Sequence, residues 1–495
     1  MKKLSLVLVG MFAVGFLMAQ NTTNLTQTGG NQNATIGQSG ANTAVVTQST
    51  DDGMAQRANV SQTGSSSITI TQTETGAATH GVSIPVQTAD VYQNGANNIG
   101  TISQTESGSG DKYLSSVKLD QFGGDNNTSH QTTNAPGNNS GLTVIGYQNG
   151  NLNNITQNIT SGYTEYFKAE QRGNSNTANQ TGSGSTADGT IYQQGNTNTA
   201  TQILAGMNNG YDRTGMLIRQ IGDNNKATQD FWGSGYNAGN SGETYQWGSN
   251  NTANQSGDGH HFTSIVTQNG DWNGATVNQN GTANPLLYDN SVELYQYLSN
   301  NKATITQELG SSNTLKLYQT GGGTATLSQS GNLNVVKGLS TVGTFDASWA
   351  KFSGSKLDVS QIGTKNRLSI EADGIVDVKQ NNGVLLAGNV IEFSQACGGT
   401  SNLTQNGGDA NLVKLTKTGG GSADITQTGN INKVAQFDDV FGAAGVAGAA
   451  MFNGADLDVT QIGDGNLLHL NSTSAGAIVD VTQNGMANKA SVVQN

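Results

Sequence analysis

The sequence predicts an all-β protein, a β-solenoid of stacked strand-turn-strand repeats with two strands per coil and loop insertions between coils. Three observations support this: a repeated motif, a period-two alternation of side chains, and only 3 Pro in 495 residues. Repetition at a regular spacing is typical of solenoid architectures. The motif Gln-x-Gly-x-x-Asn begins at Gln93, Gln121, Gln148, Gln171, Gln193, Gln220, Gln246, Gln268, Gln279, Gln329, Gln361, Gln427, Gln461 and Gln483.

The alternation is clearest in the last repeat. Val481 and Gln483 fall on one face of a predicted strand, and Ala490 and Val492 fall on one face of the next. Strict alternation of this kind is typical of a half-buried β-strand. The step from Gly485 to Asn488 is odd, so the alternation breaks there, and a glycine-containing turn is predicted.

The second strand of each repeat closes with another Gln, nine or eleven residues after the first, so it changes length by one two-residue period. Gln171 to Gln180 is the short form and Gln268 to Gln279 the long form. Both lengths keep the closing Gln on the inward face. The step from Gln121 to Gln131 is ten residues, which predicts a bulge or an irregular turn.

Stacking such coils about 4.8 Å apart would place Gln over Gln and Asn over Asn, so that their amides hydrogen-bond from coil to coil. Buried amides without partners are costly, so the ladder must be nearly continuous. The predicted ladder residues are Gln148, Asn153, Gln171, Asn176, Gln193, Asn198, Gln220, Asn225, Gln246, Asn251, Gln268, Asn273, Gln427, Asn432, Gln461, Asn466, Gln483, Asn488 and Gln494. The predicted turn glycines are Gly150, Gly173, Gly195, Gly222, Gly248, Gly270, Gly429, Gly463 and Gly485.

Composition restricts the function. Hydrophobic residues make up 34% of the chain and charged residues 11%, both low for a globular enzyme. The net charge of -12 argues against a nucleic-acid partner, which would call for clustered Lys and Arg. Cys397 is the single cysteine, so no intrachain disulfide can form. It is interpreted as a small residue without a role, with an intermolecular disulfide as the alternative.

Three parts of the chain are predicted. Residues 1–19, with Lys2-Lys3 before an apolar run, read as a secretory signal peptide, and no later stretch suggests a transmembrane segment. Residues 20–135 hold irregular repeats, in which Gln27 to Gln38 is read as the first strand-turn-strand unit. Residues 136–495 hold repeats with longer inserts and continue the same solenoid.

Two long inserts, 337–355 and 436–455, are predicted to lie along one edge, between a closing strand and the next opening strand. The second contains the apolar, Gly/Ala-rich run 441–452, which is read as an exposed contact patch or as a loop packed on its own coil. The C-terminal residues end on the repeat itself, which predicts an open strand edge to which another molecule can add.

No catalytic, metal-binding or cofactor-binding group is predicted, and the chain is not expected to be an enzyme. His260-His261 are read as a surface loop rather than a metal site. The acidic pair Asp51-Asp52 lies in an insert, where neighbouring side chains on an extended chain point apart. The four Trp residues lie in inserts, at turns or beside a motif Gln, and are read as edge packing, with an aromatic sugar platform as the alternative.

The extended pattern Gln-x-Gly-x-x-Asn-x-Ala-x-x-x-Gln resembles the curlin repeat of curli fibre subunits, over most of the predicted mature chain. Two repeats match it at every marked position: Gln268, Gly270, Asn273, Ala275 and Gln279, and Gln483, Gly485, Asn488, Ala490 and Gln494. The resemblance implies a secreted β-solenoid that polymerises into extracellular amyloid fibres for adhesion and biofilm formation. It also implies export through a dedicated outer-membrane pore and nucleation at the cell surface. This chain differs from the family in its greater number of repeats and its long inserts.

Three functions are therefore weighed. The first is a self-assembling fibre subunit, whose partners would be further copies of itself, other curlin-type subunits or a nucleator. The second is a monomeric β-solenoid adhesin, or a carbohydrate- or ice-binding protein that uses a flat outer face. The third is a polysaccharide-degrading β-helix, which is disfavoured because acidic side chains and Arg do not cluster on neighbouring coils.

Overall fold

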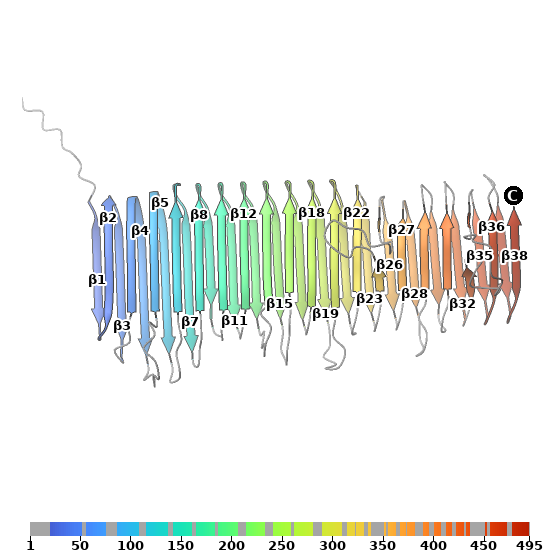
Figure 1. The fold of residues 1–495 in the computed structure, drawn as a ribbon, viewed down its shortest axis with the longest axis horizontal. Helices are drawn as coiled ribbons and strands as arrows, with labels where there is room; N and C mark the ends of the chain where they lie inside the picture. Colours follow the sequence, from blue (N-terminus) through green and yellow to red (C-terminus); the bar gives the residue numbers. More distant parts are fainter. Residues whose placement is uncertain are drawn as a thin grey trace, which may run out of the picture.

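The computed structural model consists of strands stacked side by side along one long axis (Figure 1). It describes residues 20–51, 56–75, 87–107, 115–136, 142–160, 165–183, 187–205, 214–232, 241–258, 262–280, 290–308, 314–321, 323–330, 335–337, 351–352, 355–362, 367–372, 374–381, 390–395, 400–406, 412–417, 422–429, 432–435, 451–452, 456–472 and 478–494. Every regular element in these residues is a strand. The predicted fold class, an all-β solenoid, is confirmed.

The strands form two rows, and within each row every printed pairing is parallel. The first row runs through β1 (Thr22–Thr28), β3 (Thr43–Thr50), the second halves of β4 (Gln56–Thr75) and β5 (Gln87–Ser107), β7 (Thr128–Pro136), β9 (Asn154–Ile159), β11 (Thr177–Ser183), β13 (Thr199–Ala205), β15 (Lys226–Trp232), β17 (Thr252–Asp258), β19 (Gly274–Asn280), β21 (Lys302–Glu308), β23 (Thr324–Ser330), β26 (Leu357–Ile362), β28 (Val376–Asn381), β30 (Ser401–Asn406), β32 (Ala423–Thr428), β35 (Leu457–Ile462) and β37 (Val479–Asn484).

The second row runs through β2 (Gln32–Gly40), the first halves of β4 and β5, β6 (Ser115–Phe122), β8 (Leu142–Asn149), β10 (Glu165–Arg172), β12 (Ala187–Gln194), β14 (Thr214–Ile221), β16 (Ser241–Trp247), β18 (Phe262–Asn269), β20 (Asn290–Tyr297), β22 (Thr314–Thr320), β24 (Val335–Lys337), β25 (Lys351–Phe352), β27 (Arg367–Ala372), β29 (Val390–Gln395), β31 (Leu412–Lys417), β33 (Lys433–Ala435), β34 (Met451–Phe452), β36 (Leu467–Ser472) and β38 (Lys489–Gln494). One coil is one strand from each row.

The core is a thin layer between the two rows. Buried and part-exposed residues alternate along the strands, as in β3 and β17. Small residues face large ones in neighbouring coils: a Cβ on Gly242 would lie 2.7 Å from the ring of Phe231, which is fully buried. The close packing of the interior therefore depends on complementary side-chain volumes across coils.

The motif turn changes edge along the chain. From Gln38 to Gln319 the motif Gln lies in the second row, with the exception of Gln279 in β19, and a short turn leads to the first row at the upper edge of Figure 1. From Gln329 onward the motif Gln lies in the first row, and the turn leads to the second row at the opposite edge. The repeat is thus displaced by half a coil between Gln319 and Gln329.

Three details of the sequence prediction are corrected or explained. Gln27 lies in the first row, on Gln48, so the turn after it lies at the opposite edge from the turn after Gln38. The turn after Gln121 is one residue longer than the turn after Gln148. Asn127 and Gly124 replace the predicted Asn126 and Gly123 in it, because Asn153 N–H bonds to Asn127 and a Cβ on Gly124 would meet the Gly150 carbonyl.

The two long inserts do not separate a closing strand from an opening one, because each interrupts a strand position of the second row. β24 and β25, on either side of residues 338–350, both pair with β22 and with β27. β33 and β34, on either side of 436–450, both pair with β31 and with β36. The prediction that each insert separates a closing strand from the next opening strand is wrong for this reason, and residues 338–350 and 436–450 themselves lie outside the described residues.

Several predicted features lie outside the described residues. They are the signal peptide 1–19, His260-His261, Trp349, Cys397 and most of the apolar run 441–452. In the part of the chain that the structure covers, no helix is long and apolar enough to span a membrane.

Candidate functional site: amide ladders, turns and end coils

A glutamine ladder runs through the second row without a gap from Gln38 to Gln319. Each Nε2 donates to the Oε1 of the Gln in the following coil, over 2.6–3.1 Å. All these bonds point the same way along the axis, so their dipoles add and each bond polarises the next. The ladder includes Gln148, Gln171, Gln193, Gln220, Gln246 and Gln268, which are all fully buried.

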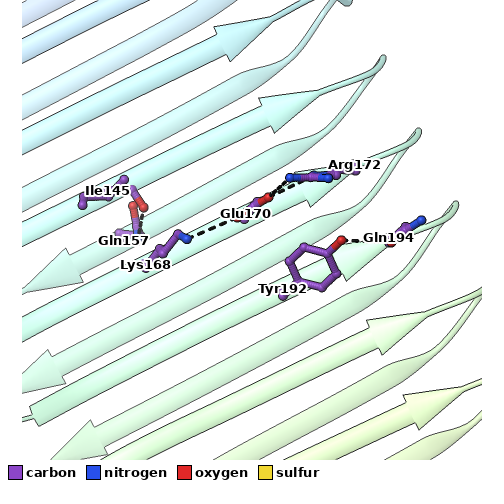
Figure 2. A network of polar contacts seen from close by, with 7 residues as sticks. All are labelled: Ile145, Gln157, Lys168, Glu170, Arg172, Tyr192 and Gln194. Atoms are coloured by element: carbon purple, nitrogen blue, oxygen red, sulfur yellow. Dashed lines mark hydrogen bonds and ion pairs between the residues drawn. The ribbon is translucent and has the colours of Figure 1, made fainter.

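The same amides join the two rows. Gln171 Nε2 also donates to the Asn154 carbonyl at 3.0 Å, and Gln193 Nε2 to the Thr177 carbonyl at 3.0 Å. In the other direction, Gln157 of the first row donates to the Ile145 carbonyl of the second row at 3.1 Å, as Figure 2 shows. Each of these ladder amides therefore connects neighbouring strands within its own row and also connects its row to the opposite row.

The first row carries a ladder with two steps. Gln104 lies opposite Thr133 rather than Gln131, and Gln255 lies opposite Val277 rather than Gln279. At each step the ladder moves by one two-residue period, as the short and long repeats predict. The first Gln after each step, Gln131 and Gln279, has a buried Oε1 without a hydrogen-bond partner, because no Gln of the previous coil reaches it.

The predicted ladder residues do not form one ladder. Gln427, Gln461 and Gln483 lie in the first row, with Gln329, Gln361, Gln380 and Gln405. Gln461 Nε2 donates to Gln483 Oε1 at 2.7 Å. Gln494 lies opposite Ser472, so no ladder Gln precedes it in the second row.

The asparagines stack differently from the glutamines. Asn176 N–H donates to Asn153 Oδ1 at 3.0 Å, while Asn176 Nδ2 donates to the Gly195 carbonyl at 2.8 Å. The Asn side chain thus bonds mainly to the backbone of the neighbouring turns. The N–H to Oδ1 bond recurs at Asn153, Asn198, Asn225, Asn251, Asn273, Asn466 and Asn488. Asn432 accepts the bond from Asn466 and donates Nδ2 to the Thr428 carbonyl.

The turn glycines allow the turns to stack. All nine predicted glycines have φ between 105° and 125°. A Cβ on Gly195 would lie 2.0 Å from the Gly222 carbonyl oxygen, and Gly150 and Gly173 show the same approach. Glycine is therefore required both by its backbone conformation and by the space between coils.

Sequence reasoning missed a third ladder on the outside of the turns, at the position after the glycine. Asn151 N–H donates to Asn174 Oδ1, Asn174 N–H to Asn196 Oδ1, and Asn196 N–H to Asp223 Oδ1, over 2.7–3.1 Å. The signal for it is the Asn or Asp that follows the turn glycine in many repeats. Sequence reasoning also missed the left-handed residue that precedes the Asn in many of the described turns, such as Thr197 with φ 56°.

A band of tyrosines and charges lies on the outer face of the second row. Figure 2 shows Glu170 between Lys168 and Arg172, at 3.2 and 2.7 Å, and Tyr192 donating to Gln194 at 2.9 Å. The hydrogen bond to Glu170 raises the pKa of Arg172. Burial, with Glu243 beside the hydroxyl, raises the pKa of Tyr245 to about 12. These exposed pairs contribute little stability.

Chemistry of other kinds is not assembled in the described residues, where no group of three His, Cys, Asp or Glu side chains could hold a metal ion. The groups that the arrangement presents for interaction are the backbone groups at strand edges and the side-chain amides. Among the described strands, β1, β2, β37 and β38 pair on one side only. The outermost rung at each end therefore presents backbone and ladder groups to a further strand.

The fold and the ladders define a parallel β-solenoid whose repeats are joined by buried amides. The family model of the curlin-associated repeat matches residues 289–321, which contain β20, β21 and β22. This part of the chain therefore contains a curlin-associated repeat. None of the curated proteins compared with the chain matches it.

Proposed function

We propose that this chain is the subunit of an extracellular, curli-like amyloid fibre that serves cell adhesion and the biofilm matrix. The curlin repeat on a β-solenoid is typical of curli-type structural proteins. The observation that carries the proposal is that, among the described strands, β1, β2, β37 and β38 pair on one side only, while every strand between them is joined to its neighbours by backbone bonds, and many also by ladder amides. The partners would be further copies, curlin-type subunits or a nucleator, and a dedicated outer-membrane pore.

Growth would repeat at each joint what already holds the coils together. An added coil contributes backbone bonds in two rows, one Gln bond and the Asn-to-backbone bonds of the turn. The buried amides would otherwise lack partners at the joint, and an unpaired buried amide costs about 1–3 kcal/mol. Stacking in register is therefore favoured over stacking out of register.

The test is seeded elongation of the purified chain, followed by thioflavin fluorescence and electron microscopy. Gln483→Leu with Asn488→Leu should slow elongation about tenfold, equivalent to about 1.4 kcal/mol at the growing end. The matched control is Asn484→Leu with Lys489→Leu, which changes exposed side chains on the same two strands. A chain that stays monomeric under seeding would contradict the proposal and favour the monomeric adhesin.

A further inference from the structure

Tyrosines occur at every second coil in one outward column of the second row. This column, called here the tyrosine column, holds the residue directly before each ladder Gln, and the strand registers stack it through consecutive coils. Its alternating tyrosines are Tyr92, Tyr147, Tyr192, Tyr245 and Tyr295, and the coils between them carry Asp120, Glu170, Arg219 and Thr267. At a coil spacing of about 4.8 Å, successive rings lie about 9.6 Å apart.

The stability of the sheet does not explain this alternation. Aromatic rings in adjacent coils can stack directly and stabilise a sheet, as Tyr295 does on Tyr318 at the end of the column, with 5.3 Å between ring centres. Rings two coils apart cannot touch one another. The contacts that replace stacking, from Arg172 and Arg219 to the Tyr192 ring, involve exposed cations and are weak. The spacing is better explained by a ligand that has the same repeat.

The rings are held in place and remain accessible. Figure 2 shows the Tyr192 ring face-on over the strands, with its hydroxyl donating to Gln194 of the same strand at 2.9 Å. The Tyr245 hydroxyl donates to Glu243 at 3.0 Å, and the Trp247 ring lies parallel to the Tyr245 ring. All five tyrosines are exposed or part-exposed. A ligand would therefore meet rings that are already ordered, which lowers the entropy lost on binding.

The charges beside the rings are balanced. Lys168 and Arg172 both contact Glu170, at 3.2 and 2.7 Å, and Lys316 contacts Glu293 at 3.2 Å. The column therefore presents no block of one sign, which favours a neutral ligand over a charged polymer. The guanidinium, amide and carboxylate groups next to the rings are donors and acceptors suited to hydroxyl groups.

We propose that the tyrosine column binds a neutral, extended β-linked glucan that lies along the axis of the solenoid. Equatorially linked glucose units form a flat ribbon in which every second unit presents the same face, and this two-unit repeat is close to two coil spacings. Each tyrosine stacks on one such face, and the polar groups of the intervening coil bond to hydroxyls of the unit between. This site goes beyond the proposed function, and it does not depend on assembly.

The test is calorimetric titration of the purified chain with cellohexaose, which is long enough to reach three of the tyrosines. Maltohexaose is the comparison, because it contains the same sugar in α-linkage and coils instead of forming a ribbon. Cellohexaose should bind saturably and at least tenfold more tightly than maltohexaose. Fibre formation is followed separately by thioflavin fluorescence, so that the site and the proposed function are tested independently.

The spacing is tested by exchanging two side chains of the column. Tyr192→Arg with Arg219→Tyr keeps the number of tyrosines but places two of them in adjacent coils, and it should weaken cellohexaose binding at least tenfold. Tyr192→Phe keeps the ring in place and should bind within about threefold of the unchanged chain, an energy difference of about 0.6 kcal/mol. The matched control is Tyr166→Ala, which removes an exposed tyrosine from the same row, four positions along the strand from the column.

Affinity that is unchanged by the exchange would overturn the proposal, as would equal binding of the two oligosaccharides or binding of neither. A larger loss with Tyr166→Ala than with the exchange would place the site elsewhere and overturn it too. If the exchange narrows bundles of fibres while the unchanged chain binds no glucan, the column is a contact between copies and the proposal is wrong.

Discussion

Residues at the turns show most directly how backbone conformation and stacking distance act together. Gly195 and its counterparts combine a positive φ with a close carbonyl in the next coil. At the equivalent position of the repeat that begins at Gln296, the chain has Leu298, with φ 67°. A side chain in this left-handed conformation is strained by roughly 1–2 kcal/mol.

Leu298→Gly should therefore stabilise its coil by about 1 kcal/mol, since it removes the strain and the exposed side chain is not part of the core. Gly195→Ala should destabilise its coil, and by a larger amount, because its Cβ meets the Gly222 carbonyl. Hydrogen exchange of the adjacent strands measures both effects. Gly215→Ala, with open space at its Cβ, is the control. Destabilisation by Leu298→Gly would show that Leu298 contributes packing instead.

The stability of the fold should depend on pH through the part-buried carboxyl group of Asp120. Desolvation by burial raises the pKa of its carboxyl, with Lys118 opposing, and its Oδ1 has no hydrogen-bond partner. A carboxyl with a raised folded-state pKa destabilises the fold as pH rises through its titration range, and the penalty is absent below the unfolded pKa of about 3.9.

Asp120→Asn should therefore stabilise β6 and its neighbours at pH 7 and change little at pH 3. Hydrogen exchange at acidic pH and urea denaturation at both pH values measure this. A stabilisation of equal size at both pH values would attribute the effect to packing rather than to charge.

At the level of the element, the ladders explain why the strands hold one register. A slip of one residue would turn every inward Gln to solvent, whereas a slip of two keeps parity and breaks a ladder bond. The two steps in the first row are places where the chain tolerates this break, and each leaves a buried Oε1 without a partner, at Gln131 and Gln279.

The loss of stability on replacing a ladder Gln should thus depend on the position of that Gln in the ladder. Gln202→Leu removes a bond from Gln180 and a bond to Gln229, while Gln279→Leu removes only the bond to Gln307. The second should cost about 1–3 kcal/mol less. Hydrogen exchange of the neighbouring strands gives the comparison. Equal losses of protection would contradict the idea that Gln279 begins a new ladder segment.

The sequence predicts which residues of these strands face inward, but not the row in which each strand lies. Alternation and the parity of nine- and eleven-residue steps predict inward Gln and Asn, and the structure places the described ones inside. The motif reads the same in either row, however, so its change of edge between Gln319 and Gln329 could not be predicted. Strands as short as β24 and β25 carry too few residues to show alternation, and the place of the long insert was therefore misread.

The described coils form a one-dimensional stack, in which the strands of each coil pair with those of the coils next to it. Stability is then local, and a joint between two copies is equivalent to a joint between two coils. The outer band of Tyr192, Arg172 and Arg219 adds exposed contacts, with the guanidinium groups 5.8 and 5.6 Å from the ring centre, but does not alter this geometry.

We expect the axis of the solenoid to continue as the axis of the fibre that the copies form. X-ray diffraction from aligned assemblies of the purified chain tests it most directly. We expect a sharp meridional reflection at about 4.8 Å, which is the coil spacing, with strands perpendicular to the fibre axis. Ordered assemblies in which this reflection lies on the equator, or from which it is absent, would contradict the account.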